Sequence, residues 1–107
     1  MGESREFKLE IALDRDMKNS LIIKFFFNDD FSDILKFAVV FLHEKDGKFN
    51  EIVKYDGSEK ERLNVHRNYL DKSQKLYLRG EISFDTMEAC VKDIKGNWRM
   101  YLLKFLE

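Results

Sequence analysis

Apolar and polar residues alternate near the start of the chain, as they do in a strand with one buried face. Every second residue from position 7 to position 13 is apolar: Phe7, Leu9, Ile11 and Leu13. A polar stretch over 14–20 then leads into 21–27, a run of β-branched and aromatic residues. We expect two strands here, with the second pairing back on the first.

A hairpin is the clearest sheet element that the pattern predicts. Strand-forming residues fill 35–43 and 49–55, and Asp46-Gly47 lies between the two runs. Asp-Gly between two such runs is a strong hairpin signal, because both residues tolerate the positive φ angles of a tight turn. The residues over 56–79 fit either a strand or one face of a helix, and we favour a strand.

The last quarter of the chain has the spacing of an amphipathic helix. Its apolar residues recur every three or four positions: Phe84, Met87, Val91, Ile94, Trp98, Tyr101, Leu102 and Phe105. Such a stripe buries one side of a helix. Ser83 or Asp85 can cap the start, and with Asp85 as the cap Glu88 completes a capping box. Gly96 is expected to mark a kink or a break.

Together these elements predict an α+β fold, a two-layer sandwich of one antiparallel sheet and one helix. The sheet is a meander of four or five strands, and the long C-terminal helix packs on one face. The face of the sheet opposite the helix needs a cover, because one helix covers only part of such a sheet and three consecutive Phe put rings on both faces. We therefore expect a homodimer or a cognate partner protein, with Phe25, Phe26 and Phe27 at the interface.

Length and composition fit this reading. The chain has 107 residues, so we expect a single domain over 1–107. Nineteen basic and twenty acidic residues give a net charge of −1, which gives no overall attraction to phosphate. The apolar runs are too short for a membrane span, there is no signal-peptide character, and the single cysteine excludes an internal disulfide. We expect a cytoplasmic protein without membrane contact.

Motifs of the common enzyme classes are absent from the sequence, which has no Gly-rich phosphate loop, no nucleophile elbow and no paired cysteines. His43 is expected to be a polar residue at a strand end, and Cys90 a small buried filler rather than a nucleophile. We expect no metal site and no cofactor.

The segment over residues 60–79, which we call the basic segment, has a local excess of positive charge. It has six cations against two acids, a balance of +4: Lys60, Arg62, Arg67, Lys72, Lys75 and Arg79 against Glu61 and Asp71. Tyr55, Tyr69 and Tyr77 are interleaved with these cations, a composition typical of surfaces that bind single-stranded RNA. A solvated charged loop explains the segment equally well.

A ribonuclease-like, metal-independent reaction is the chemistry this segment could support. His66 would act as general acid or base, Asp56 would orient it, and Arg67 or Lys60 would stabilise charge on the phosphate. The structural alternative is that Asp56-Gly57 is simply a turn after a strand.

The middle third of the chain resembles small prokaryotic, archaeal and phage proteins of the TumE-like toxin kind. The resemblance rests on the apolar run 37–42, the Asp46-Gly47 turn, Tyr55-Asp56 and then His66. The resemblance implies a toxin-antitoxin role, with Tyr55, Asp56 and His66 at the functional site. The toxin-like proteins carry more histidine in this region than this chain does.

Three functions follow from these observations as hypotheses. The first is a toxin-antitoxin or mobile-element module that contacts RNA or a partner protein. The second is a non-catalytic homodimeric interaction domain that uses residues 25–27 and the C-terminal helix. The third is a carrier of a small ligand under a concave sheet.

Overall fold

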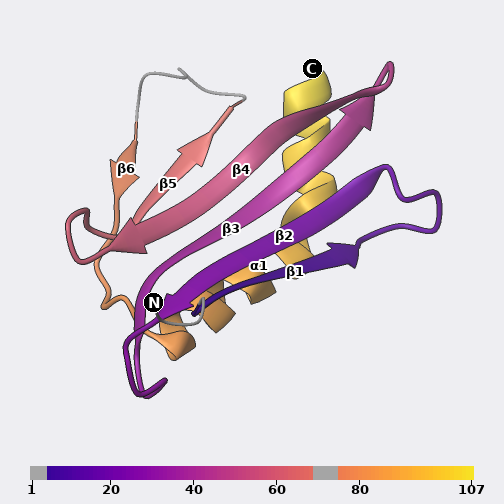
Figure 1. Cartoon of the computed structure of the whole chain (residues 1–107). Coiled ribbons are helices and arrows are strands. Elements are labelled where there is room, and N and C mark those ends of the chain that lie inside the picture. The colour runs from indigo at the N-terminus through magenta and orange to yellow at the C-terminus, as the bar shows by residue number, and fades with distance from the viewer. Residues whose placement is uncertain (1–4, 69–74) are drawn as a thin grey trace.

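A computed structural model describes residues 5–68 and 75–107 of the chain (Figure 1). Within these residues it contains six strands and one helix: β1 (Glu6–Ala12), β2 (Asn19–Phe27), β3 (Ile34–Lys45), β4 (Lys48–Ser58), β5 (Asn64–Arg67), β6 (Leu76–Tyr77) and α1 (Phe84–Leu106). The strands lie in one antiparallel sheet in the order β1-β2-β3-β4-β5-β6, and α1 packs across one face.

The α+β class, the antiparallel meander and the C-terminal helix are confirmed. The expected number of strands is wrong, because the described residues form six rather than four or five. The difference arises over 56–79, where a single strand was favoured. Two short strands, β5 and β6, lie there instead.

The β3–β4 hairpin turns at Asp46 and Gly47, as predicted. The two residues have φ angles of 55° and 78°. Positive φ at both central positions is the requirement of the tight hairpin turn whose twist matches that of the strands. The turn residues therefore fix the register in which β3 meets β4.

The prediction of a turn at Asp56-Gly57 is wrong, because β4 continues to Ser58 and contains both residues. Neighbouring chain lies close to Gly57: a Cβ atom added there would lie 3.2 Å from Leu63 Cα and would clash with the Ile82 side chain. Glycine is needed here for the close approach of neighbouring chain and not for a reversal of direction.

The core lies between α1 and the middle of the sheet. Its largest fully buried side chains include Phe41 on β3, Leu21 on β2 and Ile94 on α1. Between β3 and β4 the register shifts at Phe41/Leu42, so that both Ile52 and Val53 are buried in this core. Such a bulge bends the strand and increases its twist.

Helix α1 runs unbroken past Gly96, so the expected break there is wrong. Ser83 is the N-cap, since its side chain accepts a hydrogen bond from the Thr86 backbone amide. The alternative of a capping box from Asp85 is not adopted, because Asp85 lies inside the first turn. No helix among the described residues is long and apolar enough to cross a membrane.

Candidate interaction site

The helix leaves part of its own side of the sheet uncovered, next to β1. A groove of about 360 Å³ runs there between α1 and the first two strands. Six apolar residues line it: Leu9, Ile23, Phe25, Phe84, Met87 and Val91. Glu88, Lys92 and Lys95 of α1 supply the charged rim. We call this feature the β1 groove.

Aromatic rings gather at the end of the β1 groove where α1 begins. Phe7 stacks on Phe25 with 5.5 Å between ring centroids, and Phe25 and Phe27 each contact the Phe84 ring at 6.0 and 6.1 Å. Despite these contacts, Phe7, Leu9 and Phe84 stay 42%, 52% and 46% exposed. Adjacent exposed apolar side chains of this size are typical of an interaction surface.

The three phenylalanines predicted to form an interface divide between the two faces, as their alternation requires. Phe25 and Phe27 point to the α1 side and join the aromatic cluster. Phe26 points to the other face, where the Lys36 ammonium lies 5.3 Å from its ring centroid. The structure thus places two of the three beside the β1 groove.

The outer edge of β1 carries backbone groups that point away from the sheet. The Arg5 carbonyl accepts from the Phe27 amide, and the Leu13 amide donates to the Asn19 carbonyl, so both residues face β2. Inward and outward residues alternate along an antiparallel strand. The odd-numbered residues of β1 therefore face β2, and the amide and carbonyl groups of Lys8 and Glu10 point outward.

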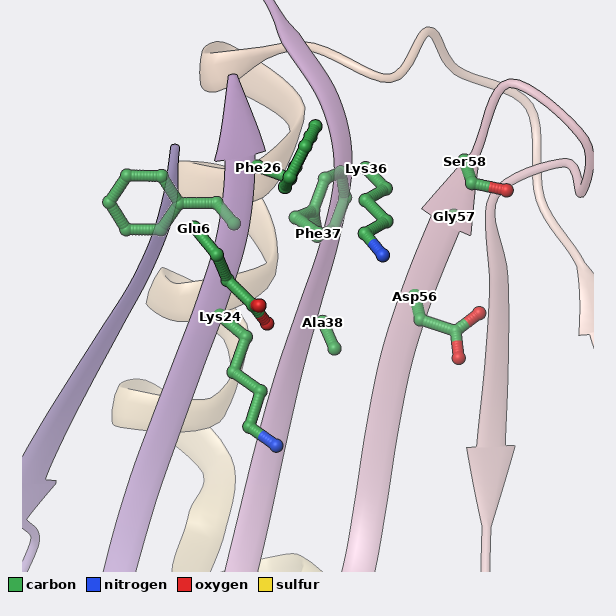
Figure 2. Close-up of a pocket in the computed structure, with 10 residues that line it drawn as sticks. Glu6, Lys24, Phe26, Lys36, Phe37, Ala38, Asp56, Gly57 and Ser58 are labelled. Atoms are coloured by element: carbon green, nitrogen blue, oxygen red, sulfur yellow. The ribbon is translucent and has the colours of Figure 1, made fainter. Parts of the chain in front are cut away.

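The face of the sheet opposite α1, which we call the open face, carries charged side chains on β1, β2, β3 and β4. Figure 2 shows Glu6, Lys24, Lys36 and Asp56 projecting from neighbouring strands on the side away from the helix. A second hollow of about 440 Å³ on this face is lined by the charged Lys8, Glu10, Glu51 and Lys54 and by apolar residues that include Ile22 and Val40. Acids and bases are balanced, which favours no phosphate-binding surface.

The three residues predicted to carry catalysis lie on two faces. Asp56 pairs with Asn64, and His66 pairs with Lys54, so Asp56 and His66 are diagonal neighbours on the open face. Arg67 pairs with Val53 and points to the α1 side, where its Nε atom is buried. Asp56 accepts a 2.8 Å hydrogen bond from Asn64 and lies 3.5 Å from the Lys54 ammonium. The described residues therefore do not bring all three side chains together.

The basic segment is spread over different surroundings. Lys75 forms a 2.7 Å ion pair with Glu61, Arg62 lies over the Tyr77 ring, and Lys60 and Arg79 are exposed. Tyr69 and Lys72, which were predicted to bind RNA, lie outside the described residues. The described part of the segment does not present one aligned row of cations and rings.

Tyr55 faces the core instead of a ligand. Its hydroxyl donates a 2.7 Å hydrogen bond to Asp93 Oδ2 on α1, and the Tyr101 hydroxyl donates to the same oxygen at 2.6 Å. Burial, and then the bond to Asp93, raises the pKa of Tyr101 to about 12 and raises the pKa of Tyr55 further. The sequence gives no sign that Asp93 unites these tyrosines, because Tyr55 is 38 residues away.

Cys90 and His43 have the structural roles expected of them. Cys90 is buried beside the sheet, and burial raises the pKa of its thiol to about 11, which suppresses the reactive thiolate. His43 lies near the end of β3, with its Nδ1 atom 2.8 Å from the side-chain oxygen of Asn19. Neither residue lies in the β1 groove.

Residues 3–107 match a family described as a domain of unknown function, DUF7718, so the chain belongs to that family. No curated protein and no solved structure matches the chain.

Proposed function

We propose that the protein is a non-catalytic protein-interaction domain that binds an extended segment of a protein partner along β1. The segment adds one strand to the sheet, and its apolar side chains enter the β1 groove. The observation that carries this proposal is the combination of a seven-residue outer strand with exposed Phe7, Leu9 and Phe84 directly beside it.

Outer strands are sites where another chain can pair, and proteins commonly shorten or cover them. At the other end of the sheet β6 has two residues, whereas β1 has seven and carries no proline. The difference supports β1 as the edge that accepts a further strand. Such recognition takes affinity from backbone hydrogen bonds and specificity from alternate side chains.

The division of β1 into two faces determines what this partner must offer. Its backbone would bond to the outward groups of Lys8 and Glu10. Its alternate side chains would point to the α1 side, where Leu9, Ile23 and Phe25 line the groove, and must therefore be apolar. The remaining side chains would lie beside the Lys8 and Glu10 side chains on the open face and are expected to be charged or polar.

Selection of binders from a display library of short random peptides tests the proposal. We expect enriched peptides to alternate apolar and polar residues, and to lose binding to a Lys8→Pro variant. Proline removes an outward amide of β1 but no hydrogen bond to β2, so the fold should be kept. Enriched peptides that bind Lys8→Pro as well as the parent protein would contradict the proposal, provided that circular dichroism shows both proteins folded.

Three expectations from the sequence stay predictions: an RNA contact, a toxin-antitoxin role and a small-ligand carrier. The lysines of the open face are the feature that most supports RNA, and the hollow of about 440 Å³ is the feature that most supports a ligand. Salt-sensitive binding of single-stranded RNA that Lys24→Ala weakens and Lys8→Pro leaves unchanged would favour the RNA module over the β1 interaction domain.

A further inference from the structure

Directly opposite Lys8 and Glu10, β2 carries no residue of opposite charge. The register places Lys24 opposite Lys8, so two like charges face each other, and it places the apolar Ile22 opposite Glu10. Like charges directly opposite each other in a sheet are destabilising, and opposite charges are stabilising. A chain added to the outer edge could place opposite charges directly beside Lys8 and Glu10.

The sequence of β1 is complementary to itself when it is reversed about Leu9. Phe7 and Ile11 lie at equal distances on either side of Leu9, and so do Lys8 and Glu10. An antiparallel copy centred on Leu9 therefore sets Lys8 opposite the Glu10 of that copy, and Glu10 opposite its Lys8. A two-fold axis produces both contacts at once.

We propose that the partner at β1 is a second copy of this chain, paired antiparallel through β1 with the two-fold axis at Leu9. This inference rests on the proposed function and names its partner. The outward backbone groups of Lys8 and Glu10 lie where this register needs them, since these two residues would form the hydrogen-bonded pairs. The product is one continuous sheet through both copies.

The apolar side of β1 fits the same arrangement. Leu9 meets Leu9 of the second copy, at a position where the Cα atoms of an antiparallel pair approach to about 4.5 Å. Phe7 meets Ile11 of the second copy. Both Phe7 and Leu9, which are about half exposed in the single chain, would gain apolar neighbours. The two β1 grooves would then face each other across the new strand pair.

Two charge reversals, Lys8→Glu and Glu10→Lys, test the register. Each variant alone places like charges opposite each other at both contacts of its own dimer, so we expect the Kd for self-association to rise about tenfold or more. When the two variants are mixed, every contact joins Glu to Lys. We expect native mass spectrometry of the mixture to show mainly the heterodimer, and the double variant to dimerise like the parent protein.

Lys48→Glu, at the β3–β4 turn and away from β1, is the matched control and should leave dimerisation unchanged. A parent protein that stays monomeric up to millimolar concentration would overturn the second-copy inference. So would a mixture of the two variants with no preference for the heterodimer. Neither result bears on the peptide selection, which tests separately whether β1 binds an extended segment. Circular dichroism checks that each variant is folded.

Discussion

The two flanks of α1 meet the sheet in different ways. On the flank toward β4, Asp93 accepts hydrogen bonds from Tyr55 and Tyr101, and Cys90 is buried beside them. On the flank toward β1, apolar side chains such as Leu9 and Phe84 border a groove and stay exposed. The comparison indicates that one flank attaches the helix to the sheet through buried hydrogen bonds, whereas the other leaves apolar surface exposed, which is the surface that we propose binds a partner.

Loss of the Asp93 carboxylate should have the largest effect on stability. Asp93→Ala leaves two tyrosine hydroxyls on largely buried side chains without their acceptor. Unsatisfied buried donors each cost about 1–3 kcal/mol, so we expect the free energy of unfolding to fall by about 3 kcal/mol. Urea denaturation followed by circular dichroism measures this change.

Leu9→Thr is the matched change on the other flank. Because Leu9 is 52% exposed, its replacement should lower the free energy of unfolding of the monomer by less than about 0.5 kcal/mol. It should nevertheless weaken association through β1. The free energies of unfolding are compared at a concentration where the protein is monomeric. If Leu9→Thr lowers this free energy as much as Asp93→Ala does, the two flanks do not differ.

Alkaline pH should lower the free energy of unfolding through Tyr101, by a smaller amount than the loss of Asp93. The pKa of Tyr101 is raised to about 12 by burial and by its bond to Asp93, whereas an unfolded tyrosine has a pKa of about 10. The folded protein therefore holds a proton that the unfolded chain releases. The contribution of Tyr101 to the free energy of unfolding should be fully present below pH about 10 and should be lost as the pH rises through about 12.

Tyr101→Phe tests this pH dependence, because it removes the titrating group while keeping the ring. We expect the variant to be less stable near neutral pH and to lose less additional stability as the pH rises. Urea midpoints measured for both proteins across this pH window give the comparison. Parallel pH profiles would show that Tyr101 does not cause the alkaline loss.

Local patterns predicted most of the fold. The period-2 alternation over 7–13, the Asp46-Gly47 turn and the apolar stripe from Phe84 to Phe105 each depend on residues close together in sequence. The expectation of a partner at residues 25–27 also rests on such patterns, and it assumed apolar surface on the face opposite the helix. The structure instead places Phe25 and Phe27 on the helix side of the sheet, beside the β1 groove.

Contacts distant in sequence account for what the patterns missed. Gly57 resembles a turn residue, but it lies in β4 because Leu63 and Ile82 approach it closely. Tyr55 resembles a base-stacking residue beside cations, but it is committed to Asp93 across the core. The grouping of His66 with Arg67 failed for a local reason instead: the two are adjacent in a strand, and adjacent strand residues point to opposite faces.

Amide hydrogen exchange at Lys8 and Glu10 tests the central claim most directly, because these amides point away from β2. If β1 pairs with a second copy, their exchange should slow as protein concentration rises, while the inward amides of Phe7 and Leu9 are protected throughout. Fast exchange at Lys8 and Glu10 at every concentration, with Phe7 and Leu9 still protected, would contradict pairing through β1.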